Sequence, residues 1–110
     1  MSQLSMYAKV AGADVIAHLE QLARPLKGMK VVHVNSTYVG GGVAEILTKL
    51  IPLSQELGLD TKWLVIDGNE PFFQCTKIIH NALQGSATRP TEQLLEVYRE
   101  TNRTNAERLR

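Results

Sequence analysis

Three consecutive glycines stand between a β-branched run and an apolar helical pattern, and this order constrains the fold more than any other feature. Residues 30–36 read KVVHVNS with little alternation, as expected of a parallel strand covered on both faces. Residues 40–42 are all glycine, and residues 43–57 then repeat apolar side chains at helical spacing until Gly58 supplies a stop. Pro52 is expected to kink this helix or end it early.

Two further elements flank this unit. Residues 10–22 carry apolar side chains at helical spacing and predict one amphipathic helix. Residues 61–66 read TKWLVI and predict a second strand. Because a helix separates the two strands, we expect them to be parallel.

The C-terminal half predicts two more helices. Pro71 fits the first turn of the earlier one, and Gly85 fits its left-handed cap. Thr91 is placed to cap the later one. The expected core stripe of the earlier helix consists of Phe72, Cys75, Ile79 and Leu83.

The β-α-β-α order predicts an α/β fold, the start of a Rossmann-like doubly wound domain. We expect residues 1–28 to form an N-terminal helical extension and residues 29–110 to form a partial Rossmann-like domain. Two parallel strands expose ladder groups on both edges, and a stable sheet usually needs more strands. The chain therefore reads as the truncated opening of a larger domain, and an exposed sheet edge makes a homo-oligomer an open alternative.

Composition limits the partners. The formal net charge is +1, from 12 basic and 11 acidic residues, so no single-sign field favours nucleic acid or an anionic membrane surface. The single cysteine, Cys75, has no internal disulfide partner and is expected to fill the core. No apolar stretch approaches the roughly 20 residues of a membrane span, and no signal peptide opens the chain, so we expect a cytoplasmic protein.

The glycine loop is the strongest candidate binding site. Free N–H groups and the positive end of a helix converge where Gly40, Gly41 and Gly42 leave room for a polar or phosphorylated ligand. The loop lacks the third glycine of a dinucleotide fingerprint and the Gly-Lys-Ser/Thr of a P-loop. A structural alternative is that the glycines only make a tight turn and allow close helix packing. Glu45, expected in the first helical turn, either favours the helix dipole or accepts a hydrogen bond from a sugar hydroxyl.

Other polar residues have adequate structural explanations. Asp67 follows the second strand where a Rossmann domain keeps a ribose-binding acid, but it also suits a turn. His80 and Asn81 lie near a helix end, where they bind either a ligand or the last carbonyls of the helix. His33 is expected to be a core histidine, and His18 falls beside the polar face of its helix. No histidine has a partner at metal-ligand spacing, so we expect no metal.

Several ordered motifs resemble the trehalose synthase family of the glycosyltransferring type, whose close relatives include retaining trehalose phosphorylases. The motifs are VVHVNST at 31–37, GGGVAEIL at 40–47 and HNALQG at 80–85. The resemblance covers most of the chain from about Tyr7 onward.

This resemblance implies a retaining GT-B glycosyltransferase of two Rossmann-like domains. Glucose would pass from a nucleoside-diphosphate glucose to glucose, giving trehalose without a cofactor or a required metal. The absent C-terminal domain would hold most of the donor. By position, Gly40, Gly41 and Gly42 would approach the transferred sugar and donor phosphates with Glu45 behind them, and His80 and Asn81 would face the acceptor. The alternatives are a fragment of a trehalose phosphorylase or a free-standing, non-catalytic sugar- or nucleotide-binding module.

Overall fold

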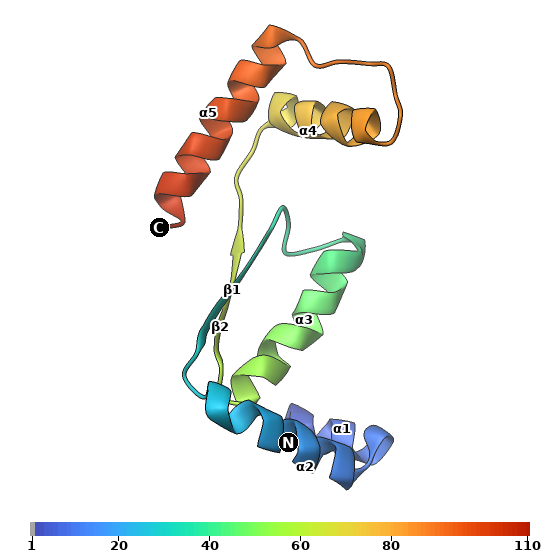
Figure 1. Ribbon diagram of the computed structural model, residues 1–110, viewed down its shortest axis with the longest axis vertical. Helices are drawn as coiled ribbons and strands as arrows, with labels where there is room; N and C mark the ends of the chain where they lie inside the picture. Colours follow the sequence, from blue (N-terminus) through green and yellow to red (C-terminus); the bar gives the residue numbers. More distant parts are fainter. Residues whose placement is uncertain (1) are drawn as a thin grey trace. The chain divides into compact units, whose positions relative to one another are not determined.

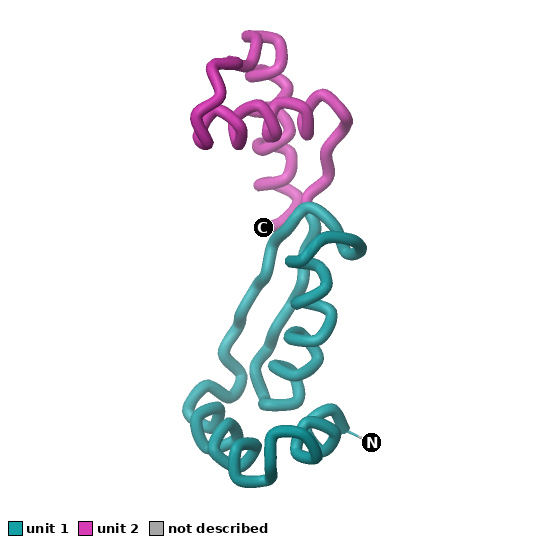
Figure 2. Tube along the Cα trace, turned by 90° about the vertical axis from the view of Figure 1, so that its right-hand side faces the viewer, with its two compact units in different colours: residues 1–65 teal, residues 66–110 magenta. Residues whose placement is uncertain are grey.

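The computed structural model describes residues 2–110 (Figure 1). The chain divides into two compact units, Met1–Val65 and Ile66–Arg110 (Figure 2). The fold is α/β and mostly helical, and it is compatible with the start of a Rossmann-like domain.

The first unit contains a two-stranded parallel sheet and three α-helices. Its elements are α1 (Gln3–Ala11), α2 (Ala13–Ala23), the 3₁₀ turn η1 (Arg24–Leu26), β1 (Lys30–Asn35), α3 (Gly41–Glu56) and β2 (Asp60–Val65). The predicted strand, glycine loop and helix therefore follow one another directly, and the predicted parallel pairing of the two strands is confirmed.

The helix α3 covers one face of the sheet (Figure 1). Burial alternates along β1, and Val31, His33 and Asn35 are the half-buried positions. Val32 and Val34 point the other way and remain 52% and 53% exposed. The expectation of cover on both faces is thus wrong for the described residues, because α3 packs on one side only.

The N-terminal helical pattern forms two helices, so the prediction of a single helix over residues 10–22 is wrong. Gly12 adopts φ 98° and ψ 148°, which ends α1 and starts α2. A positive φ interrupts a right-handed helix and is readily available to glycine. Apolar periodicity continues across this break, which is why the sequence pattern alone concealed it.

The helix α3 does not end at Pro52 but continues to Glu56, so of the two expected effects of Pro52, a kink or an early end, the early end is wrong. Its predicted end at Gly58 is confirmed, since Gly58 has φ 98° and donates its N–H to Gln55 O at 3.0 Å. The side chain of Gln55 then donates to the Thr61 carbonyl at 2.9 Å, which ties the end of the helix to β2.

The second unit consists of α4 (Glu70–Leu83) and α5 (Glu92–Arg108), which pack together (Figure 1). Phe72 is buried and stacks on Tyr98, with ring centroids 5.8 Å apart. Cys75 is fully buried, as predicted for a core residue. Leu83 is 83% exposed, so its assignment to the core stripe is wrong. It is the last residue of α4 and extends past the contact with α5.

Predicted caps define both helices of this unit. Pro71 lies in the first turn of α4, and Gly85 follows that helix with φ 105°. The Thr91 hydroxyl accepts a hydrogen bond from the Leu94 N–H at 3.2 Å and caps α5. No helix within residues 2–110 is long and apolar enough to cross a membrane.

The buried Asn105 of α5 fastens the segment that precedes α4. Its amide oxygen accepts from the Asp67 N–H at 2.9 Å, and its amide nitrogen donates to the Asp67 carbonyl at 2.8 Å. Arg108 adds an ion pair to the Asp67 carboxylate at 3.2 Å. These contacts give Asp67 a structural role, but residues 66–69 are irregular and form no turn, so its interpretation as a turn residue is wrong.

Candidate functional site

The glycine loop begins α3 with backbone angles that suit glycine. Gly40 is the N-cap residue with φ 77°, and Gly41 opens the helix with φ 80°. Gly42 is not among the glycines with positive φ. Two of the three glycines are therefore required by the backbone, and the third is not.

Contacts from both strands hold the loop. The ring of Tyr38 packs edge-on against Trp63 with centroids 5.0 Å apart, and its hydroxyl donates to the Trp63 carbonyl at 3.3 Å. The Trp63 indole N–H donates in turn to Asn35 Oδ1 at 2.8 Å. Thr37 stiffens the turn, because its hydroxyl accepts from the Val39 N–H at 3.1 Å and donates to the Val39 carbonyl at 2.7 Å.

Sequence reasoning missed this anchor of Asn35, Trp63 and Tyr38. A signal for it was present, because Asn35 and Trp63 lie in the later halves of two strands predicted to be parallel. Neighbouring parallel strands bring such positions together, and the observed register pairs His33 with Trp63. The anchor gives the loop a fixed position relative to the sheet.

A hollow of about 370 Å³ lies over the start of α3. Gly40, Gly41 and Glu45 are among the residues that line it, together with Tyr38, Val39, Ala44 and Thr48. Glu45 is exposed and lies beyond the first turn, because α3 begins at Gly41, two residues earlier than the pattern predicts; the expectation of a first-turn position is wrong. The lining offers backbone N–H groups and one carboxylate, and it contains no lysine or arginine.

The space above the glycines is open. A Cβ atom built on Gly40, Gly41 or Gly42 meets no heavy atom of residues 2–110 within 4 Å. Close packing against another element therefore explains none of the three glycines. No side chain in the described structure caps the start of α3. The first N–H groups of a helix have no partner inside the helix, so these amides are available to an anion or an oxygen atom.

Alanine substitutions should separate the two kinds of glycine. We expect Gly41→Ala to lower the free energy of unfolding by about 1–2 kcal/mol, because a Cβ is strained at positive φ. Gly42→Ala should instead raise it by about 0.5–1 kcal/mol, because alanine is the better helix former and meets no obstacle. Urea unfolding followed by the fluorescence of Trp63, the single tryptophan, measures both changes. Equal effects of the two substitutions would contradict this assignment.

His80 and Asn81 belong to the last turns of α4, in the second unit, and both are exposed. Main-chain groups cap this helix end: Gln84 N–H donates to the His80 carbonyl at 3.2 Å, and Ser86 N–H donates to the Asn81 carbonyl at 2.9 Å. Neither side chain makes a hydrogen bond within residues 2–110. Both side chains are thus presented to solvent, and their contact with a sugar acceptor stays a prediction.

The two remaining histidines belong to the first unit. His33 is half-buried on the covered face of β1, so it is less enclosed than a core position, and His18 is exposed on α2 as predicted. In the part of the chain that the structure describes, no three His, Cys, Asp or Glu side chains gather closely enough to hold a metal ion.

Comparison with known proteins identifies the family. The family model described as "Trehalose synthase, N-terminal domain" matches residues 33–110, which include the glycine loop, Glu45, His80 and Asn81. The chain belongs to the trehalose synthase N-terminal domain family. The resemblance drawn from the sequence motifs is thereby confirmed.

Curated relatives agree with this family. The chain is 44% identical over 105 residues to the trehalose synthase of Pyrococcus horikoshii, covering 94% of this chain and 25% of the relative. It is 45% identical over 106 residues to that of Thermococcus litoralis, covering 96% of this chain and 26% of the relative. A trehalose phosphorylase of Pleurotus pulmonarius is more distant, with 35% identity over 89 residues, 79% of this chain and 12% of the relative. The chain thus spans about a quarter of the length of these trehalose synthases.

Proposed function

We propose that this chain supplies the N-terminal part of a retaining GT-B glycosyltransferase. The enzyme would transfer glucose from a nucleoside-diphosphate glucose to glucose and so form trehalose. The observation that carries the proposal is the glycine loop, whose helix-terminal amides face an open hollow within a segment matched by the trehalose synthase family.

The loop is suited to bind the glucose of the donor together with the phosphate that is attached to it. Backbone N–H groups at a helix N-terminus stabilise negative charge without side-chain reorganisation, as is useful when a diphosphate departs. Glu45 supplies an oxygen that accepts hydrogen bonds from sugar hydroxyls. Such a site is compatible with both the transferred glucose and the phosphate next to it.

Cationic groups must come from elsewhere in the enzyme. The hollow contains no lysine or arginine, whereas a departing diphosphate carries charge that amides neutralise only in part. In the GT-B arrangement these groups belong to the C-terminal domain, which also holds the nucleotide. This chain alone is therefore expected to bind donor weakly and to be inactive.

A trehalose phosphorylase role is the second candidate, supported by the similarity to the Pleurotus pulmonarius protein. Inorganic phosphate would then replace the nucleoside diphosphate at the same amides. The trehalose synthases match a larger share of the chain at higher identity, which favours the synthase role.

Titration of the full 110-residue chain by NMR tests the proposal. We expect UDP-glucose or ADP-glucose to shift the amides of residues 40–45 and the indole N–H of Trp63, because Trp63 contacts Tyr38 of the loop. Glucose and trehalose should shift His80 and Asn81. Inorganic phosphate serves as the comparison for the phosphorylase role. A dispersed spectrum that responds to none of these ligands would overturn the proposal.

A further inference from the structure

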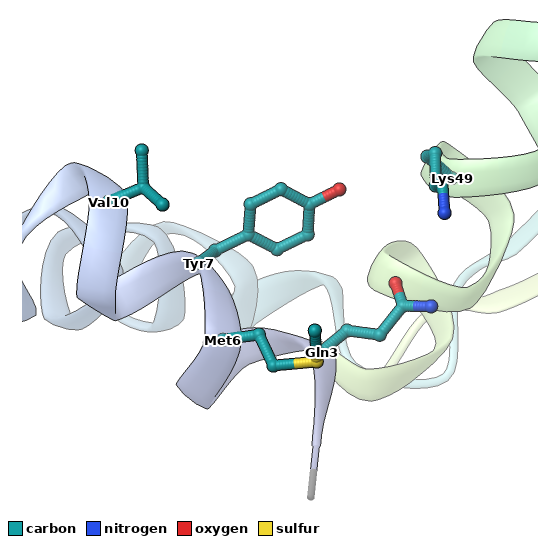
Figure 3. Close-up of a pocket in the computed structure, with 5 residues that line it drawn as sticks. All are labelled: Gln3, Met6, Tyr7, Val10 and Lys49. Carbon is teal, nitrogen blue, oxygen red and sulfur yellow. The ribbon is translucent and has the colours of Figure 1, made fainter.

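A groove between α1 and α3 shares no lining residue with the hollow at the glycine loop. It has a volume of about 310 Å³ and is lined by Gln3, Met6, Tyr7, Val10 and Lys49 (Figure 3). This volume lies at the lower end of the range of small-molecule sites, which is about 300–1,000 Å³. The proposed glycosyl transfer does not use it.

Three polar groups converge at one end of this groove. In Figure 3 the Tyr7 hydroxyl points toward Lys49, and the Gln3 amide lies near the same end. The Lys49 ammonium and the Tyr7 hydroxyl have no hydrogen-bond or ion-pair partner among residues 2–110. The Gln3 amide oxygen is shielded from solvent and also lacks a donor; because it only accepts hydrogen bonds, it does not take part in binding a carboxylate. A few convergent polar groups beside apolar walls are typical of a ligand site.

Two apolar side chains of α1 also line the groove. Met6 is 55% exposed and Val10 is 88% exposed, although α1 packs on α2 and α3. Methionine adapts its flexible side chain to the shape of a bound group. These two side chains therefore offer a surface for an apolar tail.

The groove exists because α1 is fixed to the end of α3. The Glu56 carboxylate accepts hydrogen bonds from the Gln3 and Leu4 N–H groups, each at 3.1 Å. These two amides belong to the first turn of α1, where a negative charge is favourable because of the helix dipole. The contact joins residues more than 50 positions apart and positions Gln3 and Tyr7 opposite Lys49.

We propose that this groove binds a small organic carboxylate with an apolar tail. The ligand carboxylate pairs with the Lys49 ammonium and accepts a second hydrogen bond from the Tyr7 hydroxyl. Its tail lies along Met6 and Val10. Lys49 makes no ion pair within residues 2–110, although Glu45 lies one turn earlier on α3 and Glu56 two turns later, so its charge is available to an anionic ligand. The apolar side chains of the groove favour an anion with an apolar tail over small hydrophilic anions.

Hexanoate is a suitable probe, and hexylammonium and 1-hexanol are its matched controls. In NMR titrations of the full chain, we expect hexanoate to shift Tyr7, Val10 and Lys49 saturably. Hexylammonium should bind at least about tenfold more weakly, because its charge repels Lys49. Equal binding of all three compounds would show a merely apolar surface and would overturn the proposal, as would no response to hexanoate.

Substitution of Lys49 gives the decisive variant, since this exposed position tolerates change without unfolding. We expect Lys49→Met to weaken hexanoate binding at least about tenfold, and Lys49→Arg to preserve it. The response of residues 40–45 to nucleotide sugars should stay the same in both variants, which separates this site from the glycine loop. Unchanged hexanoate affinity in Lys49→Met would contradict the proposal.

Glu56 tests the architecture of the groove. Glu56→Ala removes the acceptor of two N–H groups and should weaken hexanoate binding by loosening α1, whereas Glu56→Gln keeps one acceptor oxygen and should preserve part of the affinity. Hexanoate binding that is indifferent to Glu56→Ala would show that α1 does not form the site.

Discussion

Replacing Asn105 with alanine is expected to lower the free energy of unfolding of the second unit by about 2 kcal/mol. Asn105 is 5% exposed and makes two hydrogen bonds to the main chain of Asp67. The substitution removes both hydrogen bonds to Asp67, and each such bond typically contributes about 0.5–1.5 kcal/mol to stability. Urea unfolding followed by circular dichroism measures the loss, and amide exchange at Asp67 reports it locally.

Asn102 provides the matched control on the same helix. Its side-chain nitrogen donates only to the Tyr98 carbonyl one turn earlier, at 2.9 Å, and its surroundings are exposed. We expect Asn102→Ala to change the free energy of unfolding by less than about 0.5 kcal/mol. If Asn105→Ala unfolds at the same urea concentration as Asn102→Ala, the contacts to Asp67 do not stabilise this unit.

Gly41→Val is expected to reduce trehalose formation by about a hundredfold in an enzyme that contains this loop. The suitable enzyme is a chimera in which this chain replaces the matching segment of the Pyrococcus horikoshii trehalose synthase. Valine is strained at φ 80°, so the loop must move, and a displacement of about 1 Å at a reacting group can cost a hundredfold in rate. Initial rates of trehalose release from nucleoside-diphosphate glucose and glucose measure the effect.

Gly42→Ala separates a functional loop from a merely structural one in the same chimera. The structure offers no steric or conformational reason for glycine at this position within the described residues. Gly42 does not line the hollow, but the proposed donor phosphates approach all three glycines, so a methyl group there should lower activity although stability does not fall. Full activity of Gly42→Ala would indicate that no ligand approaches this residue closely.

Local signals in the sequence predicted much of the fold. Both strands, the glycine loop and α3 lie where the patterns place them, to within two residues at each end. Thr91 caps α5 as expected, because its hydroxyl is the side-chain type that pairs with a free N–H three residues later. Strands, turns and helix caps depend on residues that are close in sequence, so the sequence alone predicts them.

The incorrect predictions of the fold concern positions where the apolar pattern does not indicate which residues pack together. An apolar pattern continues across Gly12, and only the backbone angles show that two helices are present. Apolar residues such as Val32 and Leu83 were assigned to covered faces, but no described element packs on them. Pro52 is accommodated within α3, since the end of that helix is held by Gln55 and Gly58.

The candidate site was predictable in outline and not in detail. Its glycines follow from the strand–loop–helix order, whereas its anchor joins Asn35 to Trp63 across 28 positions. The clamp between Asp67 and Asn105 spans 38 positions. Side-chain hydrogen bonds at such separations leave no periodic trace in one sequence, so only the folded structure shows them.

The central claim is that this chain forms the N-terminal part of a trehalose-forming glycosyltransferase. The most direct test is the unmodified chimera with the Pyrococcus horikoshii trehalose synthase, purified and assayed for trehalose from UDP-glucose or ADP-glucose with glucose as acceptor. The account predicts trehalose with retained configuration at the transferred carbon, and none from this chain alone. A folded chimera that binds the donor but forms no trehalose would contradict it.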